Sequence, residues 1–383
     1  MALRKILTSQ FISVFLSQFS LSFAANLLIP TLPIYLAGLG SREETIGVLI
    51  GAISVSSVIL RPAVGKALTR TPERKFLLAG ALIYVVTSLS YIVAPPFWPF
   101  FIVRILQGVG AAFFYTASIL MVINMSPEAH RAESISYFYT AYNFAAVIAP
   151  TVGMVMINLM NFPSLFLLCA ALSLLSLFFA LRLPKKSTQP FGSEPTQNRP
   201  LFDIETLHPA VMCCLVHILW GALAAFFPLY ALSQGVTNPG FFFGACALTL
   251  IVGRMLGGRI LDRYSRERVI LPCLIAFIAS MILLAFSKTL PLFILVAVIY
   301  GAGLAFFFPT LVVYTVERAG AARGPAMGTF SAAGDLGIGL GAVIMGVVVR
   351  LTNYPIMFLC LALVAVISLG YFQCFMRDRS KRP

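Results

Sequence analysis

Arg61-Pro-Ala-Val-Gly65-Lys-Ala-Leu-Thr69-Arg70 and Arg254-Met-Leu-Gly-Gly258-Arg-Ile-Leu-Asp262-Arg263 are two versions of one pattern, R-x-x-x-G-x-x-x-(T/D)-R. Their first arginines lie 193 positions apart, about half of the 383-residue chain. The same offset relates three pairs of glycines: Gly51 and Gly244, Gly108 and Gly301, and Gly110 and Gly303. A pattern repeated at half the chain length predicts a protein built from two related halves.

The composition places the chain in a membrane. Hydrophobic residues make up 60% of it, charged residues only 10%, and the mean hydropathy is +0.94. Soluble globular proteins carry about 25% charged residues. Apolar runs long enough to span a bilayer as a helix recur along the sequence. They predict twelve spans, at 11–36, 45–68, 76–94, 98–124, 133–159, 162–183, 208–233, 240–261, 269–287, 290–316, 324–350 and 354–376.

The basic residues indicate how these spans are oriented. With the N-terminus inside the cell, 21 of the 27 Lys and Arg residues fall in inner segments and three in outer segments. The remaining three, Arg61, Arg104 and Arg254, lie within the predicted helices. This asymmetry follows the positive-inside rule and predicts that both termini are cytoplasmic. The net charge of +14 is therefore attributed to topology, and no nucleic-acid partner is expected.

One polar segment, residues 184–207, interrupts the apolar pattern between the sixth and seventh spans. It contains Lys185, Lys186, Pro190, Pro195 and Pro200, which disfavour a helix and suit a linker. The predicted fold is an all-α membrane protein of twelve transmembrane helices in two six-helix bundles. The bundles are 1–183 and 208–383, joined by a cytoplasmic linker at 184–207.

The pattern around Gly65 and Gly258 resembles the loop motif G-x-x-x-D-R-x-G-R-R of the major facilitator superfamily. The second copy keeps the acid as Asp262, whereas Thr69 replaces it in the first. The resemblance extends over nearly the whole chain. The D-R-Y loop and the run D-L-G-I-G-L-G from Asp335 resemble the drug and sugar proton-antiporter group. The resemblance to this superfamily implies two bundles related by a pseudo-two-fold axis.

The resemblance also implies a cytoplasmic gate, in which arginines and an aspartate pair across the halves and at helix ends. The first copy has Thr69 in place of the acid, while Asp262 is expected to pair with Arg131 or the start of helix five. Simple positive-inside anchoring is the alternative for the individual basic residues. The expected gate residues are Arg70, Arg131, Asp262, Arg263 and Arg266.

Helix four carries Arg104-Ile-Leu-Gln107-Gly108-Val-Gly110-Ala-Ala, which resembles the family stretch R-x-x-Q-G-x-G-A-A. An arginine inside a membrane helix is costly unless it faces a cavity or a partner. The resemblance implies a part in proton coupling or substrate binding for Arg104. The alternative is a structural arginine whose hydrogen bonds fix helix four.

Asp335 is the only one of the 13 acidic residues placed in the middle of a predicted helix. A carboxylate there can bind and release protons, so Asp335 is the expected proton carrier. Arg61 lies at a similar predicted depth, and in this superfamily helices two and eleven pack together. We therefore expect an Arg61–Asp335 pair that breaks when Asp335 is protonated; a permanently paired, structural acid is the alternative. The expected proton-coupling residues are Asp335, Arg104 and Arg61.

Polar and aromatic residues of helices one, four, seven and ten are candidates for a substrate cavity. His217 lies mid-helix with Trp220 three residues later on the same face. A cavity histidine binds substrate or titrates near neutrality, and a hydrogen bond to a neighbouring helix is the alternative. The candidates are Asn26, Arg104, Gln107, Tyr115, His217, Trp220, Phe227 and Tyr300.

These observations favour a secondary active transporter that works by alternating access, with proton-coupled export of small organic molecules. One alternative is an organic-anion or siderophore transporter in either direction, because three arginines face one aspartate inside the membrane. An uncoupled facilitator is another. We expect a monomer in a bacterial inner membrane, driven by a proton gradient, with a small-molecule substrate and no cofactor.

Enzyme classes find no support in the sequence. Seven scattered cysteines show no C-x-x-C spacing and suit helix packing, so no metal site is expected. No G-x-x-x-x-G-K-(S/T) loop occurs, and no Ser-His-Asp arrangement is evident. The chain is therefore predicted not to be an enzyme.

Overall fold

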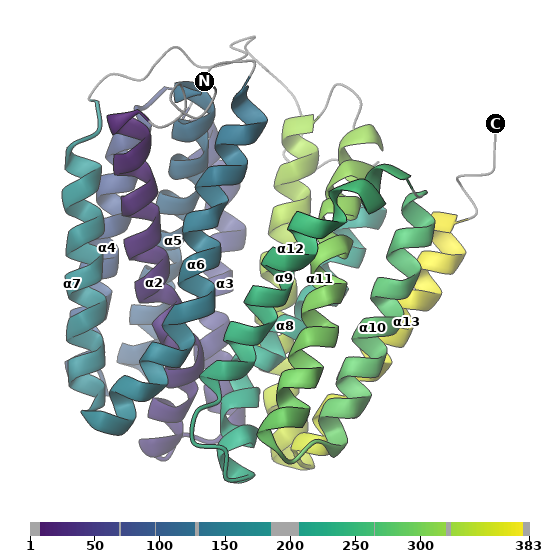
Figure 1. Cartoon of the computed structure of the whole chain (residues 1–383). Helices are drawn as coiled ribbons and strands as arrows, with labels where there is room; N and C mark the ends of the chain where they lie inside the picture. The colour runs from purple at the N-terminus through teal and green to yellow at the C-terminus, as the bar shows by residue number, and fades with distance from the viewer. Residues whose placement is uncertain are drawn as a thin grey trace. The chain divides into compact units, whose positions relative to one another are not determined.

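The structure is a computed structural model that describes residues 8–68, 70–95, 97–126, 130–184, 207–263, 265–318 and 323–377. Within these residues the fold is all-helical (Figure 1). The helices are α2 (Ser9–Gly38), α3 (Glu43–Ala67), α4 (Glu73–Val93), α5 (Trp98–Met125), α6 (Arg131–Leu159), α7 (Phe162–Leu181), α8 (Leu207–Ser233), α9 (Gly240–Arg263), α10 (Arg266–Phe286), α11 (Leu290–Arg318), α12 (Arg323–Leu351) and α13 (Tyr354–Tyr371).

These twelve helices confirm the all-helical class and the helix order predicted from the sequence. Their ends agree with the predicted spans to within three residues, except at the end of the last span. There α13 stops at Tyr371 and a π-helical segment, Phe372–Arg377, continues it. In the described part, eleven helices are long and apolar enough to cross a membrane, and α9 is apolar over Gly240–Met255.

The chain forms two compact units. The first comprises Met1–Thr31 and Val55–Asn198, and the second comprises Leu32–Ser54 and Arg199–Pro383. The stretch Leu32–Ser54 groups with the second unit because the small residues of α3 in it pack on α12. Residues 185–206 of the predicted linker lie outside the described residues, so bundle boundaries at 183 and 208 stay predictions.

Helix packing repeats between the units. In the first, α4 packs against α5 and α7; in the second, α10 packs against α11 and α13 (Figure 1). Gly110 meets the ring of Tyr84 in the first unit, and Gly303 meets the ring of Phe277 in the second. Tyr84 corresponds to Phe277, and Gly110 to Gly303, at the 193-residue offset. The sequence repeat is therefore also a repeat of packing geometry.

Helix ends repeat as well. Gly40 and Gly235 follow the ends of α2 and α8 and adopt positive φ angles of 79° and 82°. After each glycine the next amide bonds back into the helix, Ser41 N to Leu36 O and Val236 N to Ala231 O, both at 3.0 Å. This is the Schellman closure, which favours glycine because the left-handed conformation penalises a Cβ.

On α7 of the first unit, serine side chains are turned inward and several leucines outward. On α7, Ser173 and Ser176 are fully buried, whereas Leu167 and Leu174 are exposed. The hydroxyl of Ser17 donates to the carbonyl oxygen of Ser176 over 2.9 Å and so joins α2 to α7. Lipid tails offer no hydrogen-bond partners, so polar groups of a membrane protein are satisfied inside. The chain is a multi-pass membrane protein.

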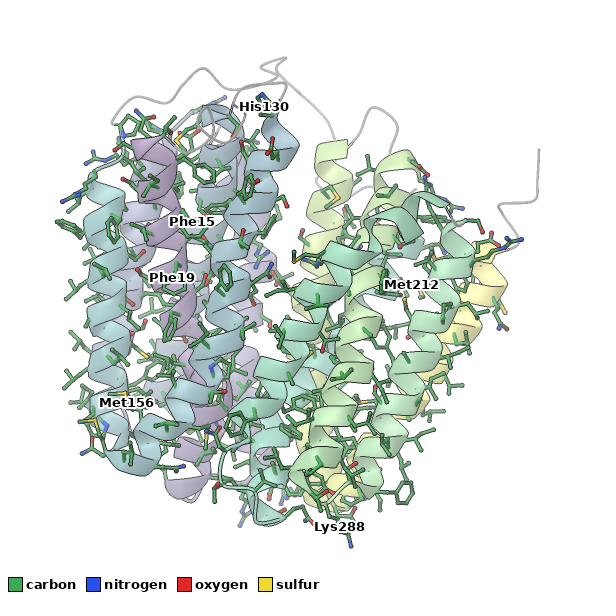
Figure 2. The ribbon with its side chains drawn as sticks, viewed as in Figure 1. Phe15, Phe19, His130, Met156, Met212 and Lys288 are labelled. Carbon is green, nitrogen blue, oxygen red and sulfur yellow. The ribbon has the colours of Figure 1, made fainter. Side chains whose placement is uncertain are left out.

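Charged groups gather at the helix ends. His130 and Met156 mark opposite ends of α6, and Lys288 lies where α10 connects to α11 (Figure 2). Met212, on α8, lies away from Lys288, toward the opposite end of the second unit (Figure 2). The middle of each unit is left to apolar helix faces and to the few polar groups described next.

Candidate functional site

Helix α12 contacts two neighbours in the second unit through residues without bulky side chains. On one side, a Cβ at Gly337 or Gly341 would overlap the carbonyl oxygens of Cys214 and Ile218 in α8. On the other, Gly339 lies against Gly51 of α3. Small residues at these positions let three helix backbones approach closely. The ion pair of Arg350 with Glu44, at 2.7 Å, closes the α3 side.

Asp335 lies in the interior of α12, beside this contact. In the described chain, every other acidic residue lies in the first or last turn of a helix. Its neighbour Gly334 faces α8, where an added Cβ would lie 3.1 Å from Cε1 of His217 and 3.3 Å from Sγ of Cys213. Asp335 is also within electrostatic range of the Cys213 thiol. The expected proton carrier therefore stands at the α8–α12 contact.

His217 lies on the α8 side of that contact. Its Nδ1 donates a hydrogen bond of 2.8 Å to the carbonyl oxygen of Cys213, one turn earlier in α8. The imidazole also packs against the ring of Phe308 in α11, with the centroids 4.7 Å apart. This bond at Nδ1 stays within α8, and the two roles expected for His217 stay predictions.

Arg104 belongs to a buried polar network in the first unit. Its Nη1 donates to Oε1 of Gln107 over 2.6 Å, and the hydroxyl of Tyr91 donates to the same oxygen over 2.6 Å. Arg104 and Gln107 are 7% and 2% exposed, so water reaches neither freely. These bonds fix the guanidinium on α5, and neither Gln107 nor Tyr91 carries a charge that would neutralise it.

Arg61 and Arg104 act on the same group of tyrosines. Both positive charges are within electrostatic range of Tyr84, and that of Arg61 also reaches Tyr115. Tyr115 in turn hydrogen-bonds to Ser22 and Tyr84. The first unit therefore contains a cationic region around Tyr84 and Tyr115. Arg61 and Asp335 belong to different units, and their pairing stays a prediction.

Further polar residues of α2 join this region. The amide of Gln18 donates to the hydroxyl of Ser22 over 3.1 Å and accepts from the hydroxyl of Ser118 over 3.2 Å. Asn26 instead donates to the carbonyl oxygen of Ser22 in its own helix, at 2.8 Å. Gln18 thus bridges α2 and α5.

The aromatic candidates of the second unit pack together. Trp220 stacks on Tyr300, with the ring planes at 4° and the centroids 6.4 Å apart. Tyr300 and Phe227 are fully buried. Phe227 lies 4.0 Å from the ring of Phe242 and belongs to a cluster of phenylalanines. Trp220, half-buried, is the member of this group with the most accessible ring.

The gate candidates are described only in part. Thr69 and the side chains of Arg131, Asp262 and Arg263 lie outside the described residues. Arg70 is exposed after the end of α3. Arg266, at the start of α10, forms an ion pair with Glu317 near the end of α11.

A matching contact occurs in the first unit, between residues that the motifs do not include. The amide of Asn124, near the end of α5, donates to Glu73 at the start of α4 over 2.5 Å. Glu73 corresponds to Arg266, and Asn124 to Glu317, at the 193-residue offset. Applying that offset to polar residues at helix ends would have found both pairs. Each ties the third helix of its half to the fourth.

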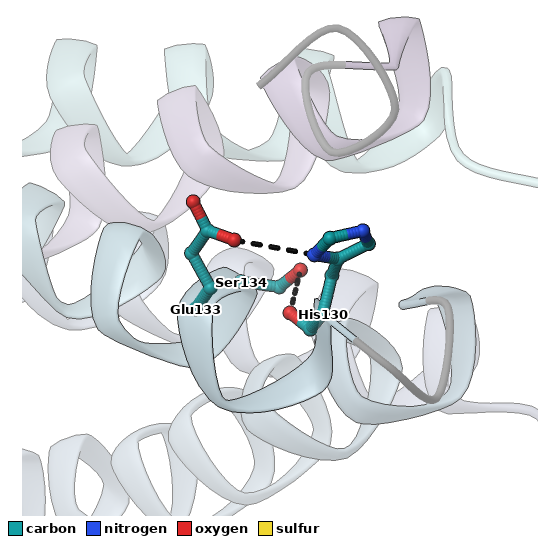
Figure 3. A network of polar contacts seen from close by, with 3 residues as sticks. All are labelled: His130, Glu133 and Ser134. Atoms are coloured by element: carbon teal, nitrogen blue, oxygen red, sulfur yellow. Dashed lines mark hydrogen bonds and ion pairs between the residues drawn. The ribbon is translucent and has the colours of Figure 1, made fainter. Parts of the chain in front are cut away.

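His130 begins α6 with a local network rather than a long-range contact. Its Nδ1 lies 3.3 Å from Oε2 of Glu133, and the hydroxyl of Ser134 donates to its carbonyl oxygen over 3.0 Å (Figure 3). Both side chains of the pair are about one third exposed, at 29% and 39%. This pair therefore serves the helix end and contributes little to stability.

Comparison with known proteins agrees with this architecture. The chain is 26% identical over 382 residues to the staphylopine export protein of Staphylococcus aureus, covering 94% of each chain. It is 22% identical over 356 residues to the quinolone resistance protein NorA of the same species, covering 89% of this chain and 90% of NorA. The solved structure of a point mutant of the nucleoside transporter NupG superposes with a TM-score of 0.82 at 16% identity, covering 96% of this chain and 100% of that one.

The family assignment rests on a match along both halves. The sequence profile of the Major Facilitator Superfamily matches residues 14–263 and 210–383. The twelve-helix fold and the repeated packing of the two units agree with it. Members of this superfamily are transporters and not enzymes. The chain belongs to the Major Facilitator Superfamily.

Proposed function

We propose that this protein is a secondary active transporter that exports small organic molecules in exchange for protons, by alternating access. Two kinds of observation support the proposal. The curated relatives reported above are named for export and drug resistance. Asp335 is the one acid of the described chain in a helix interior, at a contact where three helix backbones meet. This position of Asp335 is the observation that carries the proposal.

Asp335 is proposed to carry the proton, and Arg61 and Arg104 to assist it. A carboxylate removed from water binds a proton more readily than one at the surface. Its charge then changes while α12 remains in close contact with its neighbours. Arg61 supplies a fixed positive charge that favours the ionised carboxylate, so protonation weakens their attraction. The driving force is the proton gradient, and no other cofactor is invoked.

We place the protein in the plasma membrane of a bacterium, as a monomer with both termini in the cytoplasm. The bacterial origin of the relatives supports the membrane. The 21 basic residues on one side against three on the other support the orientation. A reporter that matures only in the cytoplasm is expected to be active when it is fused after Pro383. The same reporter inserted in the connection at Lys288 is expected to be inactive. Equal activity of the two fusions would reject this orientation.

The proton-coupled function is tested by transport in proteoliposomes that enclose a pH-sensitive dye. Quinolones, sugars and carboxylate metabolites are added in turn to wild type and to Asp335→Asn. We expect one compound class to move protons in wild type and the variant to lose that movement. Glu133→Gln, which neutralises an acid at a helix end, is the matched control and should behave as wild type. Equal proton movement in wild type and Asp335→Asn would exclude Asp335 as the carrier.

An organic-anion substrate is the second candidate. The observation that favours it is the cationic region of the first unit, where Arg61 and Arg104 act on the same tyrosines. A buried positive region attracts negative solutes and raises their local concentration. The carboxylate arm of the same assay separates this candidate from quinolone export. Substrate movement without any proton signal in either protein would instead identify an uncoupled facilitator.

A further inference from the structure

The imidazole of His217 lies against α12 at the level of Asp335. A Cβ built on Gly337 would lie 2.9 Å from Cβ of His217, and one built on Gly334 would lie 3.1 Å from Cε1 and 3.3 Å from Nδ1. The side chain therefore extends along α12 from position 337 to position 334. The Cε1 and Nδ1 atoms of the ring lie beside Gly334, the residue that precedes Asp335.

The hydrogen bond at Nδ1 determines which nitrogen takes part in proton exchange. A carbonyl oxygen only accepts, so Nδ1 of His217 carries the hydrogen in its 2.8 Å bond to Cys213. The lone pair of the neutral imidazole is then on Nε2, because only one ring nitrogen is protonated in that form. The backbone of α8 thus selects the tautomer in which Nε2 is the basic atom.

Among the described residues of the second unit, few other groups near this ring change charge at moderate pH. On α8 itself the neighbours are the thiols of Cys213 and Cys214, and α12 brings Asp335. From α11, Phe308 faces the ring, and Tyr300 stacks on Trp220 one turn away. From α13, Tyr371 reaches His208 and Tyr354 reaches Tyr230, near opposite ends of α8. The sequence also predicts that Arg61 of the first unit lies at about the same depth in the membrane as Asp335. Thiols, phenols and guanidinium do not titrate between about pH 5 and 8.

We propose that His217 and Asp335 together form one proton-binding site at the α8–α12 contact. The proposal rests on the proposed proton-coupled function for its use, and on the contact of the His217 ring with Gly334, the residue before Asp335, for its location. The protonated carboxyl of Asp335 gives its proton to Nε2 of His217: an O–H bond breaks and an N–H bond forms. A neutral pair becomes a carboxylate and an imidazolium, with no change in net charge. The two helices thereby exchange an uncharged contact for an attractive one.

The test uses the fluorescence of Trp220, which lies three residues from His217 on the same helix. The chain has two tryptophans, so Trp98→Phe leaves Trp220 as the single reporter. An imidazolium quenches indole emission more strongly than a neutral imidazole. Purified protein in nanodiscs is titrated between about pH 5 and 8, where histidine changes charge. We expect one quenching transition, which His217→Gln abolishes and His208→Gln, the control on the same helix, leaves intact.

Asp335→Asn decides whether the carboxylate belongs to the site. An opposite charge nearby favours the imidazolium, so removing it should lower the transition midpoint by about one pH unit or more. Gly334→Ala keeps both groups but pushes the ring away from α12, and should lower the midpoint by less. Gly328 lies on the same helix, and a Cβ there would have no neighbour within 4 Å. Gly328→Ala should therefore leave the midpoint unchanged. Because these variants keep His217, they decide the matter even if His217→Gln fails to fold.

An unmoved midpoint in Asp335→Asn would overturn the site, as would a transition that persists in His217→Gln. The outcome is separate from the test of export, because no substrate is present in the titration. A normal titration in a protein that exports none of the compound classes would retain the site and reject the proposed function. Substrate-driven proton movement that is unchanged in His217→Gln would instead retain export and reject His217.

Discussion

At the scale of single residues, the buried polar groups differ in what holds them. Gln107 accepts two hydrogen bonds of 2.6 Å, one from Arg104 and one from Tyr91. Glu44 and Arg350 pair in a place where Arg350 is 48% exposed, so solvent screens most of their attraction. A charge buried as deeply as that of Arg104 is costly to keep, and such a cost is retained where the charge has a function.

This distinction predicts opposite effects for two substitutions in one network. Tyr91→Phe removes one hydrogen bond while Gln107 keeps Arg104, so the free energy of unfolding should fall by about 1 kcal/mol and transport should persist. Arg104→Leu removes the charge while Gln107 keeps Tyr91. It should preserve the melting temperature in detergent and reduce transport about tenfold or more, since desolvated charge contacts are worth ~2 kcal/mol or more. Normal transport by a well-folded Arg104→Leu protein would make Arg104 structural.

At the scale of helices, the second unit depends on close backbone contact. The positions that face α8, Gly337 and Gly341, are four residues apart, one helical turn. Gly221 of α8 adds a third contact, against the carbonyl of Ile338. Between apolar helices in lipid no hydrophobic effect selects a partner, so fit of the surfaces decides. Any added side chain at these positions therefore acts on the packing of the helix pair.

The contrast between crowded and open glycines of α12 gives a matched prediction. A Cβ at Gly341 would overlap the carbonyl oxygen of Ile218, whereas nothing lies within 4 Å of Gly328. Gly341→Ala should destabilise the protein by ~1–3 kcal/mol, the range for overpacked sites. Gly328→Ala should be neutral or slightly stabilising, because alanine favours a helix. Melting of both variants in detergent measures the difference, and equal melting temperatures would contradict the close contact.

At the scale of the whole molecule, each unit repeats the other with changed chemistry. The contact between the start of the third helix and the end of the fourth is Glu73 with Asn124 in one half. It is Arg266 with Glu317 in the other. The same offset relates the Tyr84–Gly110 and Phe277–Gly303 contacts. Geometry is thus repeated where side-chain chemistry is not.

Repeated geometry predicts that one contact can replace the other. Asn124→Glu alone puts two carboxylates side by side at Glu73, and should lower the melting temperature and the amount of folded protein. Adding Glu73→Arg recreates the ion pair of the second half and should restore both. The measurement is melting in detergent of the single and double variants. A double variant no better than Asn124→Glu would show that the two contacts are not equivalent in geometry.

The sequence by itself determined the twelve helices, their bounds apart from the end of the last one, the two-fold repeat and the interior position of Asp335. These are local properties: an apolar run of bilayer length must form a helix, since lipid satisfies no backbone group. The tertiary structure alone decided which face of each helix meets which neighbour. It grouped Leu32–Ser54 with the second unit, turned Nδ1 of His217 to the backbone of Cys213, and brought Arg61 and Arg104 to the same tyrosines. In a membrane helix both the lipid face and the packed face are apolar, so hydrophobic periodicity does not distinguish them.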